Sequence, residues 1–333
     1  MTAALMDAPL RGLLRLLSPA GPDARLSILI YHRVLPQADP LFPNELDAAR
    51  FEAQMRDLSA CFHFMPLGDA VAGLRNGSLP ARAACITFDD GYADNAEIAL
   101  PILRRLGIPA TFFVATGFLN GGRMWNDTVI ETIRRAPGER LDLENLGLGT
   151  FDLSTIAHRQ QAIPALLGKL KYLELDARLA LVERVRQAAG TALPDDLMMS
   201  SAQVRELHAA GMEIGGHTVN HPILTRLDAQ SARAEIANGK ERLEEIIGAP
   251  VRLFAYPNGK PNQDYAAEHA QIARDLDFTA AVSTAWGAAS AASDPFQLPR
   301  FTPWDRSRMR FMLRMAQNLR RNGQMADMPS NRV

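Results

Sequence analysis

The chain has 333 residues, and 36 Lys and Arg against 37 Asp and Glu give it a net charge of −1. Its hydrophobic fraction of 47% and charged fraction of 22% are those of an ordinary globular protein, which excludes disorder and collagen-like repeats. The near-neutral charge argues against a dedicated nucleic-acid-binding protein, which would carry a strong basic excess. Cys61 and Cys85 fit no CxxC pattern, so we expect two buried thiols in a reducing compartment.

Residues 1–25 form a candidate N-terminal arm. Arg11 and Arg15 interrupt the apolar run Leu10–Leu17, which predicts a short amphipathic helix rather than a signal peptide. Such a helix would lie on the domain or on a partner, with an anchor at a membrane surface as the alternative. No segment has the uninterrupted apolar length of a membrane span. We therefore expect a cytoplasmic protein.

Short apolar runs alternate with helical patterns along most of the chain, which predicts parallel strands joined by crossover helices. Strands that are buried on both faces read as continuous apolar runs rather than as alternating ones. We expect such strands at Ser27–Tyr31, Ala84–Phe88, Ala110–Ala115, Met212–Gly215, Val251–Tyr256 and Thr279–Ser283.

End signals support three of the intervening helices. Gly107 fits the residue after the helix Asn95–Leu106. Ser200 begins the sequence Ser-Ser-Ala-Gln, which fits a capping box at the start of a second helix. Asp228 can cap a third, longer helix that stops at Gly248.

The segment 120–199 interrupts this alternation. It contains helical stretches and no clear strand, which predicts a helical insertion between two elements of the sheet. A connection of this length usually carries its own structure or function. The predicted helical stretches are Thr128–Arg135, Ala162–Leu173 and Ala177–Ala189.

The end of the chain, residues 306–333, is rich in arginine. Within Asp305–Arg321 the apolar residues recur at helical spacing, at Met309, Met312, Leu313, Ala316 and Leu319. This pattern predicts a basic amphipathic helix that packs its apolar stripe on the domain. Attraction to an anionic membrane surface is the alternative.

The most informative stretch is CITFDDGY, residues 85–92. An apolar strand ends there in two adjacent carboxylates, Asp89 and Asp90, and Gly91 permits a sharp turn. Adjacent side chains of an extended segment point in different directions, so one carboxylate can bind a metal ion while the other faces a substrate. A plain turn is the alternative, because Asp and Gly favour turns.

A second strand ends in glycines and is followed by two histidines, His217 and His221. On one helical turn, imidazoles at this spacing could converge on one ion. A pair of hydrogen-bonded loop histidines is the alternative. With one of the two carboxylates, the pair would form a set of three ligands that leaves coordination positions open for water and substrate. The neighbouring carboxylate then suits a general base for the attacking water.

Three motifs resemble those of the polysaccharide deacetylases, the family-four carbohydrate esterases that share the NodB homology domain. They are TFDDGY at Thr87–Tyr92, HTVNHP at His217–Pro222 and FAYPNG at Phe254–Gly259, each at the end of a predicted strand. The resemblance covers roughly residues 26–118 and 200–304. It implies an α/β fold, a distorted (β/α) barrel of about seven parallel strands over residues 26–305 that carries the insertion.

The resemblance implies a metal-dependent hydrolase that removes the N-acetyl group from an amino sugar. The substrate would belong to a cell-envelope glycan, a glycolipid or an exopolysaccharide precursor. By motif matching, Asp90, His217 and His221 would hold one divalent metal, most often zinc, and Asp89 would be the general base. Cobalt, nickel or iron would also suit two histidines and one aspartate.

The same matching places a substrate groove beside the third motif. Tyr256, Pro257 and Asn258 would line it, with a backbone N–H of the Tyr256–Pro257 segment helping to hold the oxyanion. Trp125 and Trp304 are candidates to stack on sugar rings, since aromatic faces often do so. Simple burial of either tryptophan is the alternative.

The sequence departs from the better-known members at two motifs. Ala255 stands where they carry an arginine, and His269, inside a predicted helix, is no good match for their C-terminal general acid. Instead, ILIYHRV at Ile28–Val34 resembles the opening strand of a rearranged branch, which includes the deacetylases of poly-N-acetylglucosamine export systems. We therefore expect His32 to be the general acid. A strand-end histidine held by a backbone carbonyl is the alternative.

Arg300 stands where such sequences place an arginine beside the general base. A cation there would keep Asp89 ionised and oriented, because a nearby opposite charge lowers the pKa of a carboxylate. A surface arginine that happens to follow a proline is the alternative.

Two further functions use the same residues. Hydrolysis of an O-acetyl ester, or of an amide in a smaller molecule, needs the same constellation. A non-catalytic carbohydrate-binding scaffold is less well supported, because the Asp89-Asp90 pair and the His217/His221 pair are both intact. The expected partner is an acetylated carbohydrate or glycolipid, with no nucleic acid. The basic C-terminal helix would suit peripheral contact with the inner membrane, and the sequence leaves the oligomeric state open.

Overall fold

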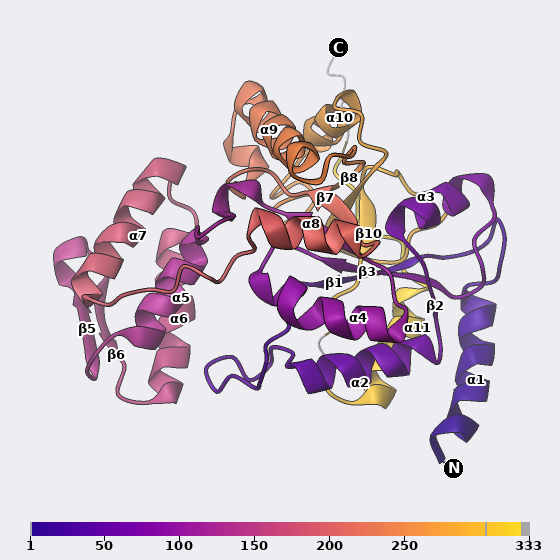
Figure 1. Cartoon of the computed structure of the whole chain (residues 1–333), viewed down its shortest axis with the longest axis horizontal. Helices are drawn as coiled ribbons and strands as arrows, with labels where there is room; N and C mark the ends of the chain where they lie inside the picture. Colours follow the sequence, from indigo (N-terminus) through magenta and orange to yellow (C-terminus); the bar gives the residue numbers. More distant parts are fainter. Residues whose placement is uncertain (1, 304, 328–333) are drawn as a thin grey trace.

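The computed structural model describes residues 2–303 and 305–327, and its main unit is a parallel barrel (Figure 1). The strands pair in the order β1-β3-β4-β7-β8-β9-β10. They are β1 (Ser27–Tyr31), β3 (Ala83–Phe88), β4 (Ala110–Val114), β7 (Glu213–Gly216), β8 (Leu253–Ala255), β9 (Ala280–Trp286) and β10 (Leu298–Arg300). A short β2 (His63–Phe64) pairs with β3 outside this order. The predicted distorted barrel is confirmed.

Helices surround the barrel, with α2, α4 and α8 along one side and α9 and α10 along another (Figure 1). The helices are α1 (Thr2–Leu17), α2 (Ala48–Ser59), α3 (Leu67–Asn76), α4 (Leu100–Leu106), α5 (Trp125–Arg135), α6 (Ile156–Leu170), α7 (Leu175–Ala189), α8 (Ser201–Ala209), α9 (Ala229–Ile247), α10 (Ala267–Asp275) and α11 (Arg308–Asn318). The short turns are η1 (Asn95–Ala99), η2 (Thr116–Phe118), η3 (Glu144–Leu146) and η4 (Leu224–Arg226). None of the described helices is both long and apolar enough to cross a membrane.

The predicted end signals act as expected. Ser200 and Gln203 form the capping box of α8, and the Asp228 side chain accepts the N–H of Ser231 at the start of α9. Gly107 and Gly248 end α4 and α9 in the left-handed conformation, at a φ of +66° in each case. The predicted helix Asn95–Leu106 forms, except that its first turn is the π-helical η1.

The barrel nearly closes between its first and last strands. Ile30 donates its N–H to the carbonyl of Phe301 at 3.1 Å, and Phe301 donates to the carbonyl of Ile28 at 2.7 Å. The two hydrogen bonds join segments from opposite ends of the chain. The residues that follow β1 therefore lie beside the residues that end β10.

Successive residues of each strand belong to two different apolar clusters. Leu29 and Ile86 share one cluster with Phe51 of α2, so they face the surrounding helices. Ile28 and Cys85 share the other with residues of β4, β8 and β9, which lie across the barrel. Both faces of the strands are thus covered, which explains their continuous apolar sequences. The thiols of Cys61 and Cys85 are both buried, as predicted.

The insertion lies to one side of the barrel and has its own apolar core (Figure 1). Val129, Leu166 and Val185, from α5, α6 and α7, meet in this core. The prediction that the segment has no strand is wrong, because β5 (Arg140–Leu143) and β6 (Gly149–Asp152) form an antiparallel pair. Each strand has four residues, and runs this short do not stand out in a sequence.

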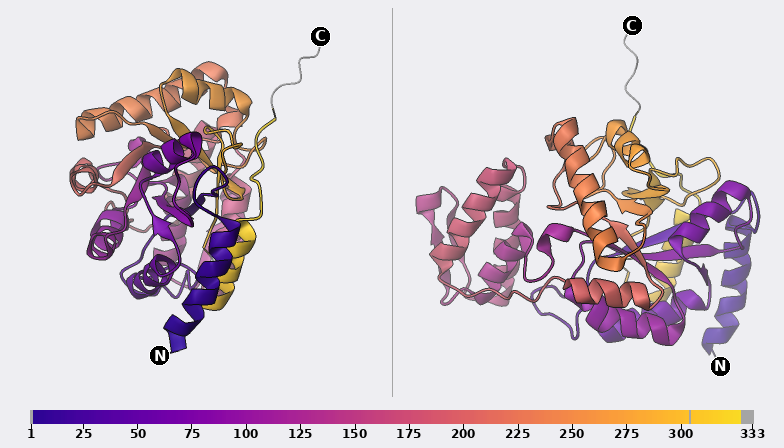
Figure 2. Two further views of the ribbon diagram at one scale, coloured as in Figure 1. Left: turned by 90° about the vertical axis from the view of Figure 1, so that its right-hand side faces the viewer. Right: turned by 45° about the horizontal axis from the view of Figure 1, so that its top comes forward.

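The first and last helices, α1 and α11, lie side by side (Figure 2). The apolar stripe predicted for α11 is partly wrong, because Met309 and Leu313 are exposed. Their positions lie at the edge of the helix that turns away from the barrel. The buried arc of the helix contains Phe311, Met312, Met315, Ala316 and Leu319.

Gly239 marks the closest approach of a helix to the loop after β7. A Cβ at Gly239 of α9 would stand 2.8 Å from the carbonyl carbon of Thr218 and 2.9 Å from its oxygen. Backbone atoms cannot swing aside as a flexible side chain can. The absence of a side chain at this position therefore fixes the distance between α9 and the loop.

We predict that Gly239→Ala lowers the free energy of unfolding by about 1–3 kcal/mol, the usual cost of overpacking. Gly168→Ala in α6 is the matched control, because a Cβ there meets no atom within 4 Å. The control should be neutral, or stabilising by up to about 1 kcal/mol, since alanine favours helices. Chemical denaturation of both variants checks this, and equal stabilities would contradict it.

Candidate active site

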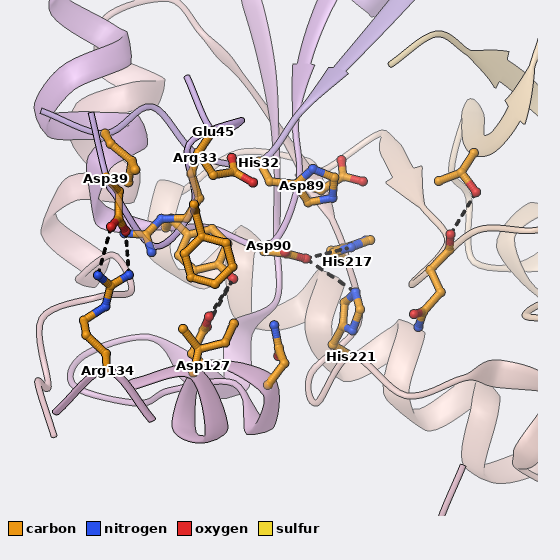
Figure 3. A pocket seen from close by; sticks show the side chains of 17 residues that line it. His32, Arg33, Asp39, Glu45, Asp89, Asp90, Asp127, Arg134, His217 and His221 are labelled. Carbon is orange, nitrogen blue, oxygen red and sulfur yellow. Dashed lines mark hydrogen bonds and ion pairs between the residues drawn. The ribbon is translucent and has the colours of Figure 1, made fainter. Parts of the chain in front are cut away.

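Loops at the carboxyl ends of the barrel strands surround a cavity of about 380 Å³ (Figure 3). His32 follows β1, and Asp89 and Asp90 follow β3. His217 and His221 follow β7. Because the carboxyl ends of parallel strands meet at one rim, motifs that are far apart in the sequence face one another there.

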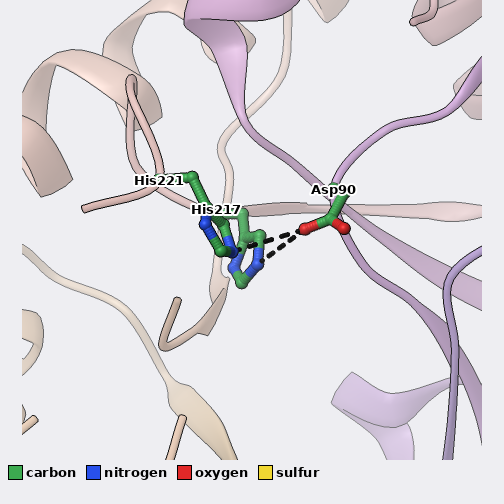
Figure 4. A group of neighbouring side chains, drawn as sticks. All are labelled: Asp90, His217 and His221. Carbon is green, nitrogen blue, oxygen red and sulfur yellow. Dashed lines mark ion pairs between the residues drawn. The ribbon is translucent and has the colours of Figure 1, made fainter. Parts of the chain in front are cut away.

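Three side chains at the rim could share one metal ion (Figure 4). One carboxylate oxygen of Asp90 lies 3.4 Å from the Nε2 atom of His217 and 3.4 Å from that of His221. One ligand atom from each residue lies within 4.8 Å of the other two. The structure thus brings together the set predicted to bind metal.

A backbone turn separates the two adjacent carboxylates. Asp89 still continues the sheet, because its N–H donates to the carbonyl of Tyr31 at 2.9 Å. Asp90 has a φ of +77°, a left-handed conformation that Asp tolerates better than most residues, and Gly91 follows at +91°. A turn at this position therefore allows the two carboxylates to contact different partners, as the prediction of separate roles for them requires.

The expected helical turn between the two histidines is wrong. Residues 217–221 form a loop in which Thr218 has a φ of +66° and His221 a φ of +51°. The hydroxyl of Thr218 accepts the N–H of His221 at 3.1 Å. Glu235 of α9 accepts the N–H groups of Val219 and Asn220 at 3.0 and 2.8 Å. These contacts, rather than helical periodicity, make the imidazoles converge.

Hydrogen bonding prepares His217 to bind a cation. Its Nδ1 atom lies 2.7 Å from the carbonyl of Ala255, and a carbonyl can only accept, so Nδ1 carries the proton. Burial alone would lower the pKa of His217, but the Asp90 and Asp89 carboxylates raise it; in the neutral form, Nε2, which faces Asp90, carries the lone pair that a metal ion would use. Burial lowers the pKa of His221 to about 4, so this imidazole is neutral near pH 7. Two imidazole nitrogens and one carboxylate oxygen suit zinc and similar divalent metals.

Asp89 and Arg300 form a buried ion pair beside this set. Two guanidinium nitrogens donate to the two carboxylate oxygens, each at 2.7 Å. Arg300 is 0% exposed, and its Nε atom donates to the carbonyl of Ser283 at 2.8 Å. Burial alone would raise the pKa of Asp89, but the Arg300 charge and hydrogen bonds hold it below its usual value. The predicted pairing is confirmed, and the alternative of a surface arginine is wrong.

His32 has an exposed ring that lines the cavity. Within the described residues its ring makes no hydrogen bond; only its backbone carbonyl is engaged, by the Asn95 side chain at 2.8 Å. The alternative of a ring held by a backbone carbonyl is therefore not what the structure has. His269 is buried in α10, where its Nδ1 atom accepts the N–H of Ala266 at 3.0 Å, and it does not line the cavity.

The third motif contributes less to the cavity than predicted. Tyr256 is buried, its hydroxyl donates to the carbonyl of Phe296 at 2.8 Å, and its N–H donates to that of Val282 at 3.2 Å. Pro257 is also buried. Neither residue lines the groove, because the pairing of β8 with β9 continues through Tyr256 and turns its side chain into the core. Asn258 does line the cavity, and its N–H has no partner among the described residues.

Comparison with known proteins identifies the family. The sequence profile of the polysaccharide deacetylases matches residues 76–140 and 143–281, more than half of the chain. This chain belongs to the polysaccharide deacetylase family. The finer assignment to a branch with an N-terminal histidine motif stays a prediction.

Relatives of this polysaccharide deacetylase agree with its fold. The chain is 22% identical over 279 residues to the Bacillus subtilis (strain 168) protein YxkH, named as a polysaccharide deacetylase, covering 83% of this chain and 71% of that one. The structure of Streptococcus pyogenes deacetylase PplD in complex with acetate gives a TM-score of 0.58 at 21% identity, covering 89% and 98%. IcaB from Ammonifex degensii gives 0.55 at 20% identity, covering 91% and 99%.

Trp125 lines a second cavity of about 240 Å³, which shares Asp90, His221 and Asn258 with the first. The guanidinium of Arg178 lies over the indole ring, 4.8 Å from its centroid. Trp125 is therefore near the site but already covered on one face. Trp304 lies outside the described residues.

Sequence reasoning missed several polar groups of this deacetylase that line the cavity. Asp127 of α5 accepts the hydroxyl of Tyr92 at 3.1 Å, and burial raises the pKa of Asp127 to about 7 despite the charge of Arg33. Arg33 is held by Asp94 at 2.8 Å. The adjacency of Arg33 to His32 was a usable signal. Trp125 was a candidate for the groove, but no local pattern indicated that Asp127, two residues further along α5, also lines it.

We predict that replacing Asp90, His217 or His221 by Ala lowers zinc content and activity together, because each change removes one of three ligands. The fold should survive, since a barrel of this size has a large core of its own. Elemental analysis and circular dichroism of the purified variants check this. His208→Ala, at an exposed position on α8, is the control and should keep its metal. Full metal occupancy in all three ligand variants would refute the assignment.

Proposed function

We propose that this polysaccharide deacetylase is a metal-dependent N-deacetylase. Its substrate would be an N-acetylated amino sugar in a cell-envelope glycan, a glycolipid or an exopolysaccharide precursor. The observation that carries the proposal is the juxtaposition of the Asp90, His217 and His221 set with the buried Asp89–Arg300 pair in one cavity. A metal-binding set and an oriented, ionised carboxylate are the two parts that hydrolysis of an amide requires.

Asp90, His217 and His221 would hold one divalent ion, with zinc the first choice. When bound, the ion would polarise the acetyl carbonyl and lower the pKa of the attacking water. The protein adds the orientation of these ligands. Ala255 fixes the tautomer of His217, and Glu235 fixes the loop that carries both histidines.

Asp89 would accept the proton of the attacking water. Arg300 holds both carboxylate oxygens, so the base is ionised and cannot rotate freely. The N–H of Asn258, which has no partner among the described residues, would donate to the oxyanion. A donor of this kind typically contributes about 3 kcal/mol of transition-state stabilisation.

His32 would protonate the leaving nitrogen of the sugar. An amine is a poor leaving group unless it is protonated, so some acid must face the site. His32 lies on the rim with an exposed ring, where solvent can restore its proton after each turnover.

O-acetyl ester hydrolysis remains the second candidate, because the same residues can carry it. An alkoxide leaves more readily than an amide nitrogen, so an ester depends less on the acid. The balance between the two activities therefore depends on His32.

We also propose that α1 and α11 contact an anionic membrane surface on the cytoplasmic side. Leu13 and Leu16 of α1 are 44% and 82% exposed, and Met309 and Leu313 of α11 are 46% and 49% exposed. Exposed arginines accompany them on both helices, at Arg11, Arg15, Arg310 and Arg314. Apolar side chains among basic ones are typical of helices that lie in a membrane interface.

We expect acetate release from N-acetylated glucosamine oligomers that a chelator abolishes and zinc restores. Asp89→Asn should keep its metal but lower kcat by roughly 10²- to 10⁴-fold, the usual contribution of a general base. Because the pKa of Asp89 is lowered, wild-type activity should fall only at acidic pH, as this carboxylate becomes protonated, and the variant should lack that fall. Asp69→Asn, at an exposed residue, is the control. Substantial activity in Asp89→Asn would place the base elsewhere.

For His32→Ala we expect a severe loss of N-deacetylation with little loss on an activated aryl acetate. The phenolate of the aryl ester leaves without a proton, whereas the sugar amine does not. Parallel kinetics on the two substrates measure this, with His63→Ala, also exposed, as the control. An equal loss on both substrates would assign His32 to a structural role.

Vesicle co-sedimentation tests the membrane contact. The wild-type protein should sediment with vesicles containing anionic lipid and less with neutral ones, because arginines near the surface contribute about 1 kcal/mol each. Leu16→Glu combined with Leu313→Glu should abolish binding. Ile156→Glu, at an exposed apolar residue of α6, should not. Binding that is insensitive to the paired change would remove the proposal.

A further inference from the structure

Two adjoining cavities link the metal-ligand set to basic residues of the insertion. The second cavity is lined by Asp90 and His221 and also by Lys171 and Arg178. A third cavity of about 300 Å³ shares Lys171 and Arg178 with it and is also lined by Arg226. We call Lys171, Arg178 and Arg226 the basic passage. It lies between the insertion, which supplies the first two residues, and η4 after β7, which supplies the third.

Arg178 is buried without a carboxylate partner. The residue is 5% exposed, and its guanidinium lies between the Trp125 ring and the backbone, where one nitrogen donates to the carbonyl of Lys171 at 3.1 Å. Its Nε atom is buried and has no hydrogen-bond partner in the described structure. Burial lowers the pKa of Arg178. A buried, unpartnered donor is costly, so a ligand that pairs with it would be favoured.

The positive charge of the basic passage is only partly compensated. Among the described residues, none of its three cations lies within 4 Å of a carboxylate oxygen, although Glu174 also lines the third cavity. Two acids are near. Glu174 interacts with Arg178 over a longer distance, and its carboxylate caps α7 through the N–H of Asp176 at 3.1 Å. Asp264, which lines neither cavity, also interacts electrostatically with Lys171.

We propose that the basic passage binds a phosphoryl group carried by the substrate, so that the substrate is a phosphorylated N-acetyl amino sugar. This rests on the proposed deacetylase function. One cavity touches both the metal ligands and Arg178, so an acetyl group at the first and a phosphoryl group at the second would be bound together. A guanidinium can bind phosphate through two parallel hydrogen bonds, and Lys171 and Arg226 add charge. A neutral glycan would leave these cations unpaired.

The residues that line the third cavity bear on which of two kinds of molecule carries the phosphoryl group. Tyr172 and Leu173 line the third cavity and are 59% and 39% exposed. These apolar side chains would cover the lipid of a polyprenyl-linked sugar. A nucleotide-linked sugar would present a polar base and ribose to them.

The test compares kcat/KM for N-acetylglucosamine 1-phosphate and for methyl N-acetylglucosaminide, which lacks the phosphate. The wild-type enzyme should prefer the phosphorylated sugar by roughly 10- to 100-fold, the contribution of charged hydrogen bonds. Arg178→Ala and Lys171→Ala should lose this preference while retaining activity on the neutral sugar. Arg178→Gln, which keeps a donor, covers the case in which Arg178→Ala fails to fold. Arg184→Ala, exposed on the same helix, is the control.

UDP-N-acetylglucosamine and a short-chain polyprenyl pyrophosphoryl N-acetylglucosamine form the two further arms, and a gain in one of them identifies the source. Calorimetric binding of N-acetylglucosamine 1-phosphate to the wild type and Arg178→Gln gives a readout that does not need turnover. Binding that depends on Arg178 in a protein that deacetylates nothing would support the passage and refute the proposed function. Deacetylation without a phosphate preference, or a preference that survives both substitutions, would overturn the inference.

Discussion

The ion pair between Asp89 and Arg300 links the chemistry of this protein to the closure of its barrel. Both side chains are buried, and desolvating two charges is compensated only when their geometry and remaining hydrogen bonds are good. Here the pair is bidentate, and the third nitrogen of Arg300 is bound by Ser283. Arg300 ends the last strand, so the pair forms only when β10 lies against β1. Removing either partner would leave a buried charge, which typically costs about 3–5 kcal/mol.

One backbone turn gives the two neighbouring carboxylates different partners. Asp89 keeps strand geometry and points to Arg300, whereas Asp90 adopts a positive φ and points to the histidines. The surroundings of both carboxylates favour the ionised form, because both pKa values lie below the usual one despite burial. Both groups are therefore anionic at neutral pH, as the proposed base and the proposed metal ligand must be.

The sequence allowed the barrel and most of the site to be predicted because both depend on local patterns. Apolar runs located the strands, and polar residues directly after them located Asp90 and His217 at one rim. The failures have physical reasons. Tyr256 follows a strand too, but continued pairing with β9 turns it inward. The contributions of Asp127 and Arg178 depend on how the insertion packs, which no local pattern encodes. The two strands of the hairpin within the insertion are too short to show the alternation of apolar and polar residues that predicts a strand.

Closure of the barrel by its first and last strands has a consequence for the order of assembly during translation. The partners Asp89 and Arg300 are 211 residues apart in the sequence. A nascent chain therefore carries both motifs of the proposed metal site, through His221, well before Arg300, the partner of Asp89, leaves the ribosome. Contacts of such separation form late, because the chain entropy of closing the loop must first be overcome. In the proposed mechanism, the metal-ligand set could thus form before the base is oriented, and hydrolysis would begin only after Arg300 has been synthesised.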